Sequence, residues 1–191
     1  MKRTTLSTLG LALILLAGCV VTSIYPYYTA KDLTFDPVLL GTWSDPEKTN
    51  TDAETWTFEK LAAQTYKWTV RDSNKTNEFD AHLFALGGAR FLDALSRERR
   101  EYNTPAHVLL RVNKLQPQLE LQILNYEWLT KQVEANPKLI RHVIVPKEAG
   151  GTDEGGGLLI LTADTAELQK FIRKHLKNTN AWGEPLVMKK Q

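Results

Sequence analysis

Short runs in which apolar and polar residues alternate recur through the middle of the chain. In 55–59 (TWTFE) and 66–70 (YKWTV), aromatic and β-branched side chains fall on alternate positions. A period of two places one set of side chains on each face of a strand, and such residues are typical of half-buried strands. The same alternation is found at 79–83, 108–112 and 119–123. The chain is therefore predicted to be mainly β.

The links between these runs are short. Gly87 and Gly88 both tolerate positive φ, which indicates a tight hairpin. Short sequential links favour antiparallel pairing of neighbouring strands. We expect an antiparallel up-and-down meander of about eight or nine strands, which removes its exposed edges most simply by closing into a barrel. A more open sheet with two packed helices is the alternative.

Two segments have a helical period instead. Residues 126–135 follow Asn125, a suitable N-cap, and are predicted to form an inserted helix. A second helix is predicted to start at Asp164, with Glu167 in capping-box position, and to be amphipathic. Its apolar stripe consists of Leu168, Phe171, Ile172, His175 and Leu176. The residues after Asn178 are expected to form a surface tail.

Aromatic side chains of the first strands would face the interior of such a barrel. The residues expected to contact a ligand there are Trp56, Phe58, Tyr66, Trp68 and Phe79. The alternative is that they form a plain core, because eight-stranded barrels can be filled by side chains.

The amino terminus has the three parts of an export signal. Lys2 and Arg3 are followed by the apolar run 9–17, then by small residues and Cys19, the only cysteine. The apolar run is short for a span of about 30 Å, which needs about 20 apolar residues. An uncleaved membrane helix is the alternative interpretation.

The stretch 16–19 (LAGC) resembles the lipobox of bacterial lipoprotein signal peptides at all four positions. The resemblance implies cleavage between Gly18 and Cys19, and a lipid anchor on the Cys19 thiol. It also implies a place in the cell envelope. Because Val20, and not Asp, follows the cysteine, an outer-membrane destination is favoured if the organism has one.

These predictions divide the chain into three parts. Residues 1–18 are the signal peptide, residues 19–34 are the lipidated amino terminus and a tether, and residues 35–191 are a single β-barrel-like domain. The precursor has 24 basic and 22 acidic side chains, and the signal peptide removes Lys2 and Arg3. The mature protein is thus neutral overall, which argues against nucleic acid as a partner.

The stretch 39–43 (LLGTW) resembles the Gly-x-Trp motif that opens the first strand of lipocalins and related calycin barrels. In that family the tryptophan closes the barrel floor, a meander follows, and a helix lies near the carboxyl end. The helix at 126–135 departs from this pattern, and a second family motif of the Thr-Asp-Tyr kind is missing. The resemblance implies a lipocalin-like barrel of the kind found in bacterial lipoproteins.

No motif in the sequence points to catalysis, to a cofactor or to a metal. Serine does not occur in a Gly-x-Ser-x-Gly elbow, and the glycine-rich loop 150–157 lacks the Lys-Ser or Lys-Thr of a phosphate loop. The carboxylate pairs 45/47, 52/54 and 153/154 fall in expected turns. His82, His107 and His142 each lie in an expected strand, and a zinc site formed across the barrel is the alternative to three separate packing roles.

The sequence therefore predicts a non-enzymatic lipoprotein held to the membrane by its lipid anchor. Its barrel would bind a small hydrophobic molecule or a segment of an envelope protein. The alternative is an envelope interaction protein with a filled core and no ligand. An enzyme is the third possibility and the least supported one.

Overall fold

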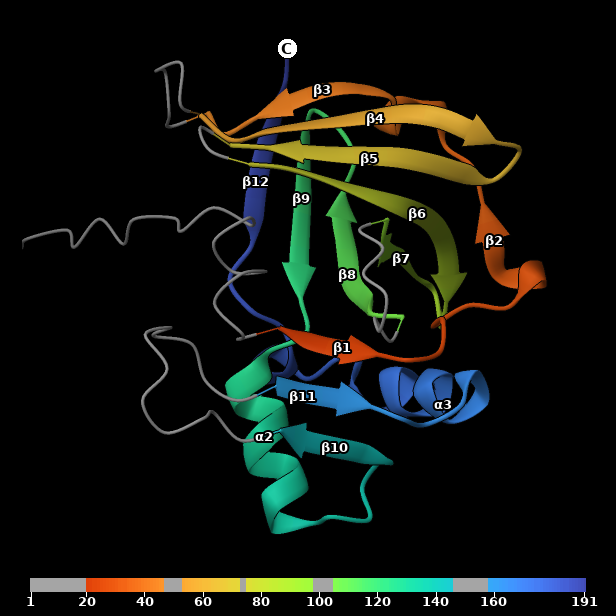
Figure 1. The fold of residues 1–191 in the computed structure, drawn as a ribbon, viewed down its shortest axis with the longest axis vertical. Helices are drawn as coiled ribbons and strands as arrows, with labels where there is room; N and C mark the ends of the chain where they lie inside the picture. The colour runs from red at the N-terminus through yellow and green to blue at the C-terminus, as the bar shows by residue number, and fades with distance from the viewer. Residues whose placement is uncertain (1–19, 47–52, 73–74, 98–104, 146–157) are drawn as a thin grey trace, which may run out of the picture.

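Eight strands form a closed antiparallel barrel in the computed structural model, which describes residues 20–46, 53–72, 75–97, 105–145 and 158–191 (Figure 1). The barrel strands are β3 (Gly41–Ser44), β4 (Thr55–Ala62), β5 (Thr65–Arg71), β6 (Thr76–Leu86), β7 (Ala89–Ser96), β8 (His107–Lys114), β9 (Gln118–Ile123) and β12 (Leu186–Lys190). Strands β3 to β9 follow one another as the alternation predicts. The predicted barrel is confirmed, and the open sheet is not.

The barrel closes through its last strand, β12. This strand lies between β9 and β3, with Met188 opposite Leu119 and Lys190 opposite Trp43, while β8 pairs with β9. The prediction of a surface tail after Asn178 is therefore wrong for these residues. Only Met188 of this strand is buried, so the local alternation was too weak to indicate a strand.

Three further strands extend the sheet beyond the barrel, and we call them the sub-sheet. They are β10 (His142–Val145), β11 (Leu158–Leu161) and β1 (Val21–Ser23). Strand β1 pairs with the start of β8, at Thr22 and Val108, and runs parallel to β11. Residues 142–145 and 158–161 do not continue the meander. They leave it because β12 takes the position beside β9.

The segment 20–34 belongs to the folded domain, which corrects the prediction of a tether. It contains β1, a 3₁₀ turn η1 (Ala30–Asp32) and β2 (Leu33–Thr34), which pairs with β6. Val20, Val21 and Tyr27 are buried. The Gln169 side chain donates to the carbonyl of Tyr27 at 3.0 Å, so the helix that contains it holds this segment against the barrel.

That helix is α3 (Thr165–His175), and the other is α2 (Tyr126–Ala135). Asn125 accepts from the Trp128 N–H and Asp164 accepts from the Glu167 N–H, so both expected N-caps are present. In the described part of the chain, no helix is long and apolar enough to cross a membrane.

The fold has two apolar clusters because both faces of several strands are covered. In β8, Val108, Leu110 and Val112 point into the barrel, whereas Leu109 points outward. The outer cluster packs the barrel wall against both helices and the sub-sheet, with Phe91 and Ile172 among its members. The amphipathic face of α3 therefore covers the outside of the barrel and leaves its interior to the strands.

The β6–β7 hairpin turns at Gly87 and Gly88, whose φ angles are +60° and +81°. An L side chain in this region costs about 1–2 kcal/mol. A Cβ at Gly87 would also lie 2.7 Å from Leu176 Cδ1, whereas at Gly88 nothing lies within 4 Å. We expect G87A to lower the unfolding free energy more than G88A does, as measured by urea denaturation. Equal losses would show that Leu176 moves aside without cost.

Candidate functional site

One end of the barrel is covered by the chain that precedes β3. We call it the hairpin end, because the β4–β5, β6–β7 and β8–β9 turns lie there. A short 3₁₀ turn, η2 (Pro37–Leu39), puts Leu39 inside the barrel at 0% exposure. The indole of Trp43 donates to the Leu39 carbonyl at 2.9 Å. Leu39 and Trp43 thus close this end of the barrel.

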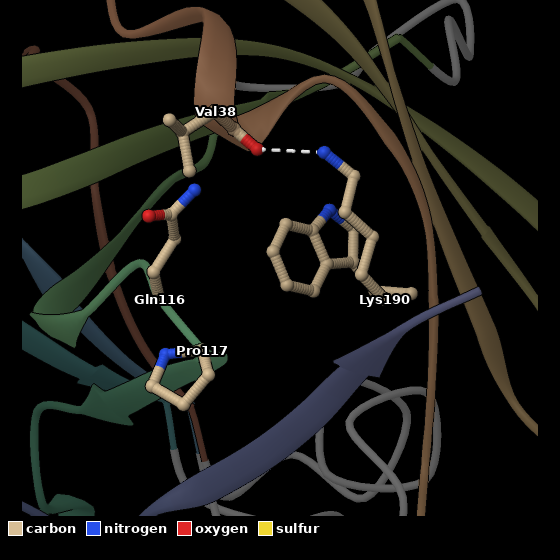
Figure 2. A pocket seen from close by; sticks show the side chains of 5 residues that line it. Val38, Gln116, Pro117 and Lys190 are labelled. Carbon is tan, nitrogen blue, oxygen red and sulfur yellow. Dashed lines mark hydrogen bonds between the residues drawn. The ribbon is translucent and has the colours of Figure 1, made fainter.

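A pocket of about 480 Å³ lies on the outer side of this closure (Figure 2). It is lined by Val38, Trp43, Gln116, Pro117 and Lys190. The Lys190 ammonium donates to the Val38 carbonyl at 3.0 Å and lies 5.2 Å from the centre of the Trp43 ring. Since an ammonium has three N–H donors, this bond leaves two for a ligand. The pocket combines an apolar floor with one positive charge at its rim.

A second pocket of about 340 Å³ adjoins the first and shares Val38 and Gln116 with it. Its polar lining includes Arg90, which lies 3.5 Å from Asp36, and Lys114, which is paired with Glu120 at 2.8 Å. Because both cations already have carboxylate partners, Lys190 is the better candidate to bind an anionic group. We call the two pockets together the rim groove.

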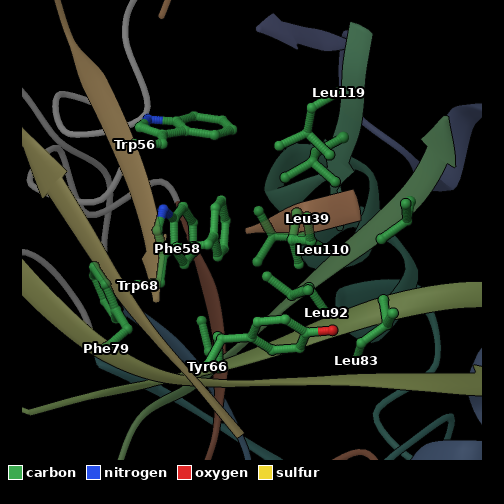
Figure 3. Close-up of a cluster of buried hydrophobic side chains, with 14 of the residues drawn as sticks. Leu39, Trp56, Phe58, Tyr66, Trp68, Phe79, Leu83, Leu92, Leu110 and Leu119 are labelled. Carbon is green, nitrogen blue, oxygen red and sulfur yellow. The ribbon is translucent and has the colours of Figure 1, made fainter. Parts of the chain in front are cut away.

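The five aromatic residues predicted to contact a ligand lie together inside the barrel and not in the rim groove (Figure 3). Trp56, Phe58 and Trp68 are each 1% exposed, Tyr66 is 0% exposed and Phe79 is 6% exposed. The Trp68 ring stacks on Phe58 at 5.3 Å and lies 5.2 Å from Phe79. These side chains contact one another as a packed core does.

Tyr66 has a further role in closing the hairpin end. Its hydroxyl accepts from the Asp36 N–H at 2.7 Å and lies 3.1 Å from the Asp36 carbonyl, to which it donates. Its ring stacks on Phe35 at 4.7 Å. Burial raises the pKa of this hydroxyl, so it stays a donor at neutral pH. Tyr66 thus fastens the covering segment to the barrel wall.

A buried polar pair that the sequence analysis did not find lies on the outer face of the barrel. Asp93 of β7 is 0% exposed, and its two carboxylate oxygens accept from His107 Nδ1 at 2.7 Å and from the Tyr27 N–H at 2.9 Å. Asp93 alternates with apolar residues in a run expected to be an ordinary strand. The pair holds the amino-terminal segment against β7 and β8, because Tyr27 belongs to that segment.

The remaining candidate residues do not converge. His82 lies opposite Asp93 in the β6–β7 register, whereas His142 is in β10 of the sub-sheet. Among the described residues there is no group of three side chains that could hold a metal ion. Several candidates lie outside the described residues. They are Gly18, Cys19, the glycine-rich loop, one residue of each of the pairs 45/47 and 52/54, and both residues of 153/154.

The histidines predict a dependence of stability on pH. Burial lowers the pKa of both His82 and His175 below the ordinary 6.5, so the folded state binds fewer protons than the unfolded state. Their contribution is present above pH 6.5 and is lost as the pH falls below it. The carboxyl groups of Glu78 and Glu120, whose pKa values are lowered, act only below pH 4.5.

We therefore expect the melting temperature to fall between pH 7 and pH 5. The double variant H82Q/H175Q is expected to show a smaller fall, because glutamine does not titrate. Calorimetry at the two pH values measures the fall in melting temperature of the wild type and of the double variant. An unchanged fall in the double variant would assign the acid sensitivity to other groups.

The comparisons with known proteins add no relative: no family model matches the chain, and neither does any curated protein or solved structure. The closed eight-stranded antiparallel barrel is nevertheless consistent with a lipocalin-like barrel. The geometry is that of a β-barrel that could bind ligands, with the rim groove as its candidate site.

Proposed function

We propose that this protein is a lipid-anchored, non-enzymatic binding protein of the cell envelope, and that its ligand occupies the rim groove. The ligand is a small amphiphile with an anionic group. The apolar side chains of Val38 and Pro117 suit its hydrocarbon part, and the Lys190 ammonium suits its anionic part. The observation that carries the proposal is this open pocket of about 480 Å³, in which apolar side chains adjoin the Lys190 ammonium.

The packing inside the barrel supports placing the ligand outside the lumen. Leu39 and the five aromatic side chains occupy the interior at no more than 6% exposure. A ligand in the lumen would have to displace them, and truncation of one large aromatic side chain in a core already costs about 3–5 kcal/mol. A ligand in the rim groove displaces nothing that is packed.

Lysine variants test the binding site. Octanoate is titrated into the protein, and binding is followed by nuclear magnetic resonance shifts at Val38 and Gln116. We expect K190Q to weaken binding about tenfold, because a charge-assisted hydrogen bond contributes about 1.5 kcal/mol or more. The neighbouring K189Q serves as the matched control, since Lys189 is also exposed but does not line the pocket. Equal effects of the two variants, or shifts without saturation, would contradict the site.

The anchor is tested separately. The lipobox-like stretch 16–19 supports lipidation of Cys19. Intact mass spectrometry of the wild-type protein is expected to show loss of residues 1–18 and addition of diacylglycerol and a third acyl chain. C19S is expected to remain uncleaved and to lose the lipid. A wild-type mass with Met1 retained would contradict the anchor.

A second candidate function is supported by the filled interior: an envelope interaction protein that works through its surface with no small ligand. Crosslinking in intact cells that recovers a partner in constant ratio, together with no saturable binding of octanoate, would favour it over the first.

A further inference from the structure

Four large apolar side chains are exposed on the two strands β10 and β11 of the sub-sheet. Val143, Val145 and Leu158 share one face and form the apolar patch, whereas Ile144 is exposed on the opposite face, beside Leu159. The exposed fractions of the four lie between 40% and 49%. Elsewhere among the described residues, only Tyr25 and Leu61 are large hydrophobic side chains with similar exposure. The concentration of four such side chains on one hairpin calls for a physical reason.

The patch lies at an edge of the sheet that has no charged residue. Strand β10 pairs with β11 alone in the described part of the chain. None of the three strands of the sub-sheet contains Asp, Glu, Lys or Arg. Exposed edge strands usually carry charges that prevent contact with other chains. An uncharged apolar edge is therefore suited to contact with another surface.

The chain enters the fold directly beside this patch. In the parallel β1–β11 pair, Val21 is opposite Leu159, so Val20 lies beside Leu158, and Val145 is opposite Leu158 on the next strand. Figure 1 shows that β1 and β11 start, and β10 ends, on the same side of the sub-sheet. With strands about 4.8 Å apart, Val145 lies roughly 10 Å from Val20. Cys19 is the residue before Val20, about 3.8 Å away along the backbone.

Val20 is also rigidly placed. It is 6% exposed and forms a bridge with Asn125, and the segment that follows is bound to α3 by Thr165 Oγ1, which donates to the Pro26 carbonyl at 2.8 Å. An acyl group on Cys19 would therefore start one residue from the fixed position of Val20. Because residues 20–34 are part of the fold, a lipid on Cys19 would hold the domain close to the membrane.

We propose that the apolar patch is a second membrane contact, which rests on the lipid bilayer into which the acyl chains of Cys19 insert. The inference rests on the proposed lipid anchor. It adds an orientation: the sub-sheet faces lipid, and the rim groove, at the hairpin end, faces away from it. A groove held in that position remains open to ligands or partners in the aqueous space.

The depth of the contact is limited by the backbone of β10. Among the described residues no strand pairs with its outer edge, and unpaired N–H and C=O groups are costly in hydrocarbon but not where water remains. Interfacial apolar surfaces typically enter only about 5–10 Å, at the boundary of headgroups and acyl chains. Val143, Val145 and Leu158 therefore contact that boundary, and β10 does not enter the bilayer core.

Site-specific fluorescence on the full lipidated protein tests this contact. A bimane probe is attached to L158C, and the protein is reconstituted into phosphatidylcholine vesicles with a nitroxide quencher near the headgroup. The matched control is L61C, because Leu61 is 47% exposed and Leu158 is 45% exposed, but Leu61 lies at the hairpin end. We expect at least about threefold stronger quenching at position 158, as for a group at the interface. The same probe on V143C measures quenching at a second position of the patch.

The outcomes separate the two proposals. Intact mass comes first: an unlipidated Cys19 overturns both the anchor and the patch contact. A lipidated protein with equal quenching at positions 158 and 61 overturns the patch contact alone. Pyrene excimers at V143C that vanish when the protein is diluted in lipid would assign the patch to contact with a second copy, which also overturns the lipid contact. Stronger quenching at both 158 and 143 than at 61 supports it.

Discussion

Replacement of Asp93 with alanine is expected to lower the free energy of unfolding by about 2–6 kcal/mol, because it leaves two buried donors without a partner, each at a cost of about 1–3 kcal/mol. The carboxylate is 0% exposed and accepts from two donors, His107 Nδ1 and the Tyr27 N–H. In D93A both donors lose their partner at a site that water does not reach. Because Tyr27 belongs to the amino-terminal segment, hydrogen exchange in residues 21–28 should also become faster.

Two variants control this prediction. D93N keeps one carbonyl oxygen and nearly the same volume, so it should lose less stability than D93A in urea denaturation. E184A removes an exposed carboxylate and should change stability by no more than about 0.5 kcal/mol. If D93A unfolds like E184A, the pair with His107 contributes nothing to the fold. If exchange in residues 21–28 is unchanged, the pair does not hold that segment.

Truncation of Trp68 to alanine is expected to cost a similar amount, about 3–5 kcal/mol, since it leaves a cavity in the barrel interior. The Trp68 ring contacts Trp56 edge-on at 5.4 Å and stacks on Phe58. Its Nε1 is buried, and within the described part of the chain it has no hydrogen-bond partner. W68F keeps a ring in place and removes this donor, so its cost should be well below that of W68A.

The matched comparison is W56F. The indole of Trp56 donates to Glu54 Oε1 at 2.6 Å, and both residues are buried. Phenylalanine at this position removes a donor from a buried carboxylate, which typically costs about 1–3 kcal/mol. W56F is therefore expected to lose more stability in urea than W68F, although the two substitutions remove the same atoms. The opposite order would show that the Trp68 N–H has a partner in solution.

The effect of W68A on ligand binding also tests the proposed function. If the interior is a packed core, W68A lowers stability and leaves octanoate binding unchanged in the protein that remains folded. If the lumen is the binding site, W68A changes affinity directly. Measurement of both quantities on one preparation separates the rim groove from the lumen.

Features that depend on neighbouring residues were predictable. The alternation in 55–59 and 66–70 predicted β4 and β5, the Gly87-Gly88 pair predicted a hairpin, and Asn125 predicted the start of α2. In each case the side chains that specify the element lie within a few residues of one another. The closed barrel followed from counting such strands and their short links.

Features that depend on distant residues could not be predicted from the sequence. The strand β12 contributes one buried side chain, Met188, so its own sequence resembles that of a tail. It becomes a strand because the open edges of β3 and β9 both need a partner. The segment 20–34 likewise lacks a periodic pattern, and its burial follows from bonds to Asp93 and Gln169, which are far along the chain.

The candidate site divides in the same way. The aromatic side chains expected inside the barrel are inside it, because strand alternation fixes which face each residue occupies. Whether they surround a ligand or one another depends on how the barrel closes, and Leu39 and Trp43 close the hairpin end. The rim groove joins Val38, Gln116 and Lys190 from three distant parts of the chain. The sequence by itself determined the strands and their faces, because these depend on nearest neighbours. The closure of the barrel, the rim groove and the position of the amino terminus were decided only in the tertiary structure. There, non-local pairing satisfies the backbone groups that a single strand leaves open.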